Sequence, residues 1–157
     1  MVGALPRVDV GIVGAGFSGL AFAAALLRRD PRLRVGLVGD PESFGTGFAY
    51  GPAAGKFPLH ARADRLGLLA GAPEGFSDWL GLAGGPRGGF PPRAAYGSYL
   101  LAQLEQLKAA VGDRLLAVPD RAESARRTRR GWSLGLRSGR ALRCDRLVLA
   151  CGALPSR

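Results

Sequence analysis

The sequence predicts an α/β fold in which a parallel sheet is joined to a small antiparallel hairpin. Two observations carry this prediction. The apolar stretch VDVGIV (8–13) is followed by the glycine-rich segment GAGFSG (14–19) and by the alanine-rich segment LAFAAALLRR (20–29). A second apolar stretch, RVGLVG (34–39), then completes strand, helix and strand, which is typical of a βαβ unit with a right-handed crossover.

The elements follow from their residue patterns in order. Residues 8–13 are rich in Val and Ile and predict a buried strand, and the helix after them is expected to end at Asp30-Pro31. Residues 40–92 are rich in Gly and Pro and predict loops, with one short helix at GFSDWL (75–80). A longer helix is expected from Ala94 to Gly112, because apolar residues recur there at spacings of three and four.

The last third of the chain predicts strands. RLLAVP (114–119) is expected to form one strand, and GWSLGLRSGRALRCD (131–145) a hairpin that turns at Ser138-Gly139 and covers one face of the sheet. RLVLACG (146–152) is expected to form a further buried strand.

The glycine-rich segment carries the functional prediction. A strand precedes GAGFSG and a helix follows it, which is the context that a dinucleotide-binding turn requires. Gly14 would permit the tight turn, Gly16 would let a pyrophosphate approach the backbone, and Gly19 would let the helix pack against the strand. The helix N-terminus then offers free N–H groups to the phosphates, and Ser18 could add a hydroxyl. The alternative is a purely structural turn.

An acidic residue is expected about 20 residues further on, where it would bind a ribose. Asp40 follows Gly19 by 21 positions and is the candidate, although Gly39 could occupy the usual place and leave Asp40 an ordinary loop residue before Pro41. Together these features predict a Rossmann-like domain that binds a dinucleotide.

Composition limits the other classes of function. The chain has 157 residues, which suits one domain, and a net charge of +10 that comes from 20 arginines and two lysines. Two separated cysteines and one histidine argue against a metal site. Residues 10–27 carry no charge, but four glycines within nine residues favour strand, turn and helix over a membrane span. We therefore expect a cytoplasmic protein with no membrane or metal partner.

Four segments together resemble one known family. They are FGTGFAYG (44–51), DWL (78–80), PPRAAYGSYL (91–100) and LVLACG (147–152). With the glycine turn they make the chain, over residues 8–155, similar to the bacterial FAD/NAD(P)-binding flavoprotein oxidoreductases, which are related to the flavin monooxygenases. The resemblance implies FAD as cofactor and NAD(P)H as a candidate reductant.

The resemblance also implies where the cofactor lies. Three glycines would cradle the pyrophosphate, an arginine would approach the phosphates, a backbone segment after the third strand would contact the adenine, and the last strand would end in a closing turn. The residues assigned to cofactor binding are Gly14, Gly16, Phe17, Ser18, Gly19, Asp40, Gly45, Gly47, Arg93, Ala122, Ala150 and Gly152.

The chain departs from the family pattern at two residues. Cys151 replaces the usual Thr of the closing turn and is expected to be a small, buried substitute rather than a redox thiol. His60 stands where the family more often has Asn, and its plain interpretation is a solvated loop residue.

Length is a further departure. The family's proteins are typically longer, and the sequence holds no second GxGxxG. We therefore expect residues 1–157 to be one FAD-binding domain, truncated relative to the family and inactive by itself, that belongs to a flavin-dependent oxidoreductase of possible monooxygenase type.

Two alternatives remain at the sequence level. One is a nucleotide-binding module without turnover, which flavin spectra with and without NADPH would distinguish from an enzyme. The other, less favoured, is an arginine-rich protein that binds nucleic acid. RRTRRGW (126–132) interleaves arginines with Trp132, which could contact a single strand, whereas a solvated hairpin with Trp132, Leu134 and Leu136 packed inward explains the same residues.

Overall fold

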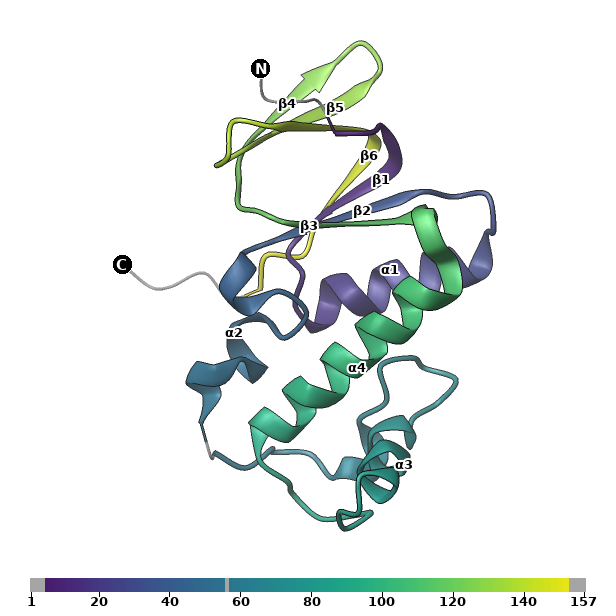
Figure 1. Cartoon of the computed structure of the whole chain (residues 1–157), viewed down its shortest axis with the longest axis vertical. Helices are drawn as coiled ribbons and strands as arrows, with labels where there is room; N and C mark the ends of the chain where they lie inside the picture. The colour runs from purple at the N-terminus through teal and green to yellow at the C-terminus, as the bar shows by residue number, and fades with distance from the viewer. Residues whose placement is uncertain (1–4, 56, 153–157) are drawn as a thin grey trace.

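The computed structural model describes residues 5–55 and 57–152, which form one six-stranded sheet with helices on one side of it (Figure 1). The strands are β1 (Val8–Val13), β2 (Val35–Gly39), β3 (Leu115–Pro119), β4 (Ala122–Thr128), β5 (Gly131–Leu136) and β6 (Ala141–Leu149). The α-helices are α1 (Phe17–Arg29), α2 (Gly47–Tyr50), α3 (Gly75–Leu82) and α4 (Arg93–Val111).

The sheet combines a parallel half with an antiparallel half. Its strand order is β3-β2-β1-β6-β5-β4. β3, β2, β1 and β6 run parallel, while β5 is antiparallel to both β6 and β4. The carboxyl ends of β1, β2 and β6 therefore meet at one edge of the sheet, which is where doubly wound proteins bind their ligands.

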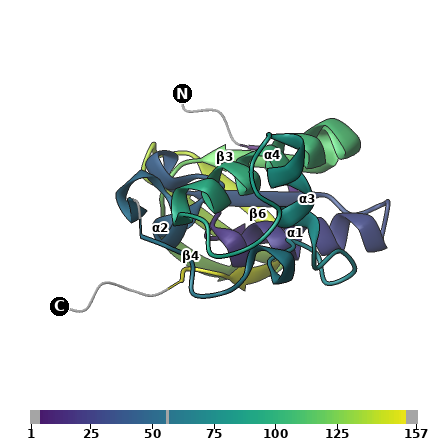
Figure 2. The same cartoon turned by 90° about the horizontal axis from the view of Figure 1, so that it is seen from below.

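Two hydrophobic clusters give the molecule three layers. One cluster joins the parallel strands to α1, α3 and α4, with Ile12 and Leu37 among its buried residues. The other joins the reverse side of those strands to β5 and β6, with Val38 and Leu134 fully buried. Figure 1 shows the helices gathered on one side of the parallel strands and the β4–β5 arm on the other, and Figure 2 shows the molecule from the helix side. The predicted α/β fold, with its hairpin over one face, is confirmed.

The ends of α1 and α4 agree with the patterns in the sequence, whereas α2 forms in a segment that was predicted to be loop. α1 ends at Arg29, and the guanidinium of Arg114 donates to the carbonyls of Leu27 and Asp30 at 3.1 and 3.3 Å, which satisfies acceptors at the helix end. α4 ends at Val111, and Gly112, with a φ of 54°, is its C-cap residue. In residues 5–55 and 57–152, no helix has the length and apolar character needed to cross a bilayer.

Two strand predictions need correction. Residues 122–128 form β4, which the sequence pattern did not indicate, because AESARRT lies at the sheet edge and is largely exposed on both faces. The second arm of the hairpin and the last predicted strand are one continuous strand, β6. Its polar Asp145-Arg146 pair is exposed and lies where β6 leaves β5 and continues beside β1.

Candidate cofactor-binding site

The glycine turn between β1 and α1 is built by close backbone contacts. Gly14 has a φ of 110°, and a Cβ placed on it would lie 2.0 Å from the carbonyl oxygen of Ala150. A Cβ on Gly19 would lie 1.8 Å from the carbonyl oxygen of Gly14. Gly14 therefore permits the turn and the approach of the β6 end, and Gly19 permits α1 to pack against the turn, as the motif predicts.

Gly16 faces a second loop across a narrow gap. Its φ of −86° is open to any residue, so space rather than backbone strain decides what fits here. A Cβ on Gly16 would lie 3.2 Å from the Cα of Gly47, which itself has a φ of 62°. The glycine turn forms one wall of a cleft of about 440 Å³, and α2 with the loop before it forms another.

The N-terminus of α1 opens into this cleft. Phe17 and Ser18 line it, and both are exposed. Gly16, the N-cap residue, supplies no side-chain hydrogen bond, and the first turn of α1 holds no acidic residue. The first N–H groups of a helix lack partners within the helix, so they and the positive end of the helix dipole are available to an anion.

Asp40 stands at the end of β2 on the cleft rim. Its Oδ1 accepts a hydrogen bond from the backbone N–H of Glu42 at 3.1 Å, which fixes the carboxylate at the start of a 3-10 turn over Pro41–Ser43. A Cβ on the preceding Gly39 would lie 2.4 Å from the Cβ of Ala15, so glycine brings the β2 end against the glycine turn. The half-buried carboxylate keeps oxygen lone pairs that can accept from hydroxyl groups.

An aromatic cluster supports the cleft from the helical core. Tyr96 of α4 is 1% exposed, and its ring centroid lies 4.8 Å from that of Tyr50 and 6.2 Å from that of Phe17, both of which line the cleft. Burial raises the pKa of the Tyr96 phenol far above its ordinary value, so the ring stays neutral. A Cβ on Gly97 would lie 2.1 Å from the carbonyl oxygen of Tyr50, so α4 packs directly against α2.

Comparison with known proteins decides the family. A family model described as FAD-NAD(P)-binding matches residues 11–154. The chain belongs to the FAD-NAD(P)-binding family. The resemblance derived from the sequence motifs is therefore confirmed, and so is the Rossmann-like class of the fold. No curated protein sequence matches the chain.

Solved structures of other proteins share this fold. A flavin-containing monooxygenase from Stenotrophomonas maltophilia is 25% identical with a TM-score of 0.64, and the match covers 97% of this chain and 42% of that one. A bacillithiol disulfide reductase from Staphylococcus aureus is 13% identical with a TM-score of 0.65, covering 94% and 39%. An oxidoreductase from Agrobacterium tumefaciens is 21% identical with a TM-score of 0.58, covering 96% and 39%. This chain thus spans less than half the length of each of these proteins.

Most of the residues predicted to bind the cofactor meet in the cleft. Those of the predicted set that line it are Gly14, Gly16, Phe17, Ser18, Asp40, Gly47, Ala150 and Gly152. Gly19 lies beneath them and shapes the turn rather than the lining.

Three residues of the predicted set lie elsewhere in this FAD-NAD(P)-binding domain. Gly45 is buried against α4, where a Cβ would lie 2.8 Å from Leu101. Ala122 begins β4. It packs against the hydrophobic cluster that joins the parallel strands to β5 and β6, which we call the meander-side cluster, and does not line the cleft. Arg93, at the start of α4, lines a neighbouring hollow of about 360 Å³ together with the exposed His60. Phe48 and Ala49 line both this hollow and the cleft, so the two adjoin.

The expected burial of Cys151 is wrong. The residue is exposed and lines the cleft, and its Sγ lies 3.8 Å from the carbonyl oxygen of Val13. It lies two residues beyond the end of β6 at the exposed Leu149, outside the hydrophobic layers, so its small side chain stays open to solvent. Cys144, in the middle of β6, is the buried cysteine, and burial raises the pKa of its thiol.

Sequence reasoning missed part of the cleft. Ser43, Thr46 and Tyr50 line it together with Ala15, Phe48 and Ala49. Thr46 is buried, and its hydroxyl lies 3.3 Å from the carbonyl oxygens of Ser43 and Gly47, so it holds the loop in shape. The segment FGTGFAYG contains several of these residues, and its paired glycines were the signal that this loop approaches the glycine turn.

Proposed function

We propose that this domain binds FAD in the cleft, with the pyrophosphate over the N-terminus of α1, and that it serves a flavin-dependent oxidoreductase of the monooxygenase type. The observation that carries the proposal is the uncapped N-terminus of α1, which opens into a cleft with the Asp40 carboxylate on its rim. Family membership and the fold shared with a flavin-containing monooxygenase support it.

The residues of the cleft fit such a ligand. The backbone N–H groups of Phe17 and Ser18 would donate to phosphate oxygens, and the exposed Ser18 hydroxyl would add a donor. Asp40 would accept hydrogen bonds from the hydroxyls of the adenosine ribose. Gly16 would keep the space above the helix end open, since the gap to Gly47 is already narrow.

The bound flavin would supply hydride and oxygen chemistry, for which protein side chains have no equivalent. The protein's part is to hold the adenosine and pyrophosphate end and to orient the rest. Arg93 and His60 lie in the adjoining hollow, and we propose that Arg93 assists by placing its positive charge toward the cofactor phosphates. NAD(P)H is the reductant to test first, because the family binds both FAD and NAD(P).

The Gly16→Ala variant tests the site. The added methyl group meets the Gly47 Cα at 3.2 Å, so both walls must shift slightly and the space for the pyrophosphate shrinks. We expect the affinity for FAD to fall by about tenfold or more, measured by titration of flavin fluorescence. The matched control is Gly71→Ala, because a Cβ on Gly71 meets nothing within 4 Å.

Equal FAD affinity of wild type and Gly16→Ala, with circular dichroism showing both folded, would refute this binding mode. A chain that binds NAD(P) and not FAD would leave family membership intact and overturn the choice of cofactor. Absorbance spectra of the FAD complex with and without NADPH then test the proposed oxidoreductase role.

A further inference from the structure

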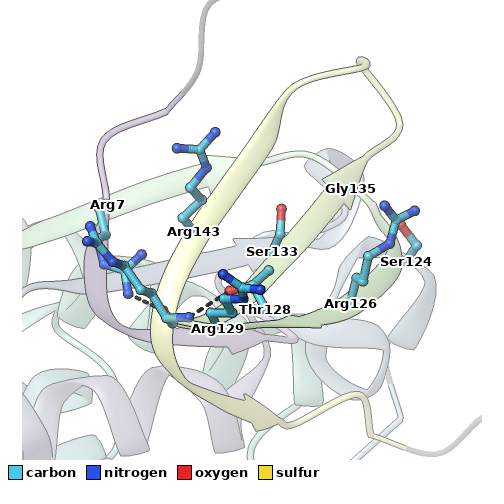
Figure 3. Close-up of a pocket in the computed structure, with 9 residues that line it drawn as sticks. Arg7, Ser124, Arg126, Thr128, Arg129, Ser133, Gly135 and Arg143 are labelled. Atoms are coloured by element: carbon cyan, nitrogen blue, oxygen red, sulfur yellow. Dashed lines mark hydrogen bonds between the residues drawn. The ribbon is translucent and has the colours of Figure 1, made fainter.

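A group of arginine and hydroxyl side chains covers the outer face of the β4–β5–β6 meander (Figure 3). They surround a hollow of about 570 Å³. This hollow shares no lining residue with the cleft beside the glycine turn. We call this surface the arginine face. Its defining residues are Ser124, Arg126, Arg129, Arg130, Ser133 and Arg143.

Strand register places two of these arginines on either side of a serine. Ser133 of β5 pairs with Arg126 of β4 and with Arg143 of β6. Neighbouring strands lie about 4.8 Å apart, so the three residues form one row across the meander about 10 Å wide. Figure 3 shows Arg126 and Arg143 on either side of Ser133.

The charge of this face is not neutralised within the described residues. Two other exposed arginines have carboxylate partners: Arg137 pairs with Glu123 at 3.1 Å, and Arg7, which also lines the hollow, is bound to Asp145. By contrast, the described part of the chain places no carboxylate within 4.0 Å of the four arginines of the face. Their mutual repulsion would be relieved by a bound anion.

None of the described residues that line the hollow is aromatic. Trp132 lies on the opposite face of the meander, where it packs against the buried cluster and its ring centroid lies 5.5 Å from the guanidinium of Arg127. Nucleic-acid bases bound at the arginine face could therefore not stack on Trp132. An occupant of the arginine face would be held by charge and hydrogen bonds alone.

We propose that the arginine face binds a compact, multiply charged phosphate anion. Guanidinium groups bind phosphate oxygens in bidentate pairs, and a hydroxyl such as that of Ser133 can donate between them. The hollow has the size of a small-molecule site. At this end of the hollow Asp145 neutralises Arg7, so the uncompensated positive charge is confined to the four arginines of the face, which favours a compact anion over a nucleic acid that extends past them.

The test is a titration of the 157-residue chain with inorganic triphosphate at low salt. Affinity is measured by calorimetry, and the position of binding by the backbone amide resonances. We expect the amides of residues 124–135 to shift and those of residues 14–19 to stay. The Arg126→Gln/Arg143→Gln double variant should bind at least about tenfold more weakly. Arg32→Gln/Arg62→Gln is the matched control, because it removes the same charge from two exposed arginines that pair with aspartates elsewhere.

Each outcome decides for or against the proposal. Shifts confined to the glycine turn would place the anion in the cofactor cleft and overturn it. An equal loss of affinity in the control variant would show attraction by net charge only. A duplex or single-stranded oligonucleotide that binds more tightly than triphosphate and depends on the same two arginines would identify a nucleic-acid surface instead. A negative result with triphosphate would not bear on the proposal that the cleft binds FAD, because the Gly16→Ala variant tests that proposal at a different site.

Discussion

Gly14 meets two separate demands of the turn between β1 and α1. Its φ of 110° lies in a region that residues with a side chain rarely adopt, and the carbonyl oxygen of Ala150 occupies the place of its Cβ. The backbone N–H of Gly14 also donates to the carbonyl of Val38 at 2.8 Å. One residue therefore holds the ends of β1, β2 and β6 together beneath the cleft.

Gly14→Ala separates these two demands when it is compared with Gly84→Ala. Gly84 has a φ of 77°, but a Cβ there meets nothing within 4 Å. In this control, only the strained backbone conformation lowers the free energy of unfolding. We expect Gly84→Ala to cost about 1–2 kcal/mol and Gly14→Ala about 3 kcal/mol or more, because it adds overpacking. Urea unfolding followed by circular dichroism measures both. Equal costs would show that the β6 end moves away freely.

The spacing of Gly14, Gly16 and Gly19 was sufficient to predict the turn, because strand, turn and helix are adjacent in the sequence. Gly97 could not be assigned in the same way. Its place is set by the carbonyl of Tyr50, which lies 2.1 Å from where a Cβ would be, and that contact exists only after α4 has packed on α2. Arg93 shows the same limit, since the pattern gives its helix position but not the hollow it faces.

At the scale of elements, a buried carboxylate joins the turn between β3 and β4 to the turn between β5 and β6. Asp120 follows β3 and accepts hydrogen bonds from the hydroxyl of Ser138 and, at 3.3 Å, from Arg140, both in the turn between β5 and β6. The hydrogen bond from Ser138 contributes most to holding the pKa of Asp120 below its ordinary value, and the backbone N–H of Arg121 and the guanidinium of Arg140 add to it. The charged carboxylate thus stabilises this end of the meander.

The Asp120→Asn variant should therefore change how stability depends on pH. A depressed pKa in the folded state stabilises the protein above the ordinary value near 3.8, and this contribution is lost as the pH falls through the folded pKa. We expect wild type to lose more stability than Asp120→Asn between about pH 7 and about pH 3 in urea unfolding. The control is Asp113→Asn, at an exposed aspartate in another turn. Parallel pH profiles for wild type and Asp120→Asn would contradict this role.

Elements in which apolar residues recur at regular spacing could be predicted from the sequence, and elements without such a pattern could not. β5 was recognisable because Trp132, Leu134 and Leu136 alternate toward the core. β4 has no such alternation, and only its pairing with β5 makes it a strand. The exposed Asp145-Arg146 pair suggested a break in β6, whereas the strand continues because β1 takes over as its partner beyond Cys144.

At the scale of the whole molecule, the parallel strands belong to two cores at once. In β2, Leu37 is buried in the cluster with the helices and its neighbour Val38 in the cluster with the meander, and both are 0% exposed. β2 therefore presents one of its faces to each core. Loss of either core would expose a buried face of β2, so we expect the two to unfold together.

The two tryptophans test this cooperativity, because each reports on one core. Trp79 of α3 packs with the helix-side cluster, and Trp132 of β5 packs with the meander-side cluster. In Trp79→Phe and Trp132→Phe, each of which keeps one tryptophan, we expect the urea midpoint of fluorescence to coincide with that of far-UV circular dichroism.

Leu134→Ala, at a fully buried residue beneath the meander, should lower the stability reported by both tryptophans by about 2–5 kcal/mol. The exposed Leu82→Ala serves as the control and should leave both midpoints in place. A Trp132 transition that precedes the circular dichroism transition would mean that the β4–β5 arm unfolds by itself, and that the parallel strands and the cleft at their carboxyl ends stand without it.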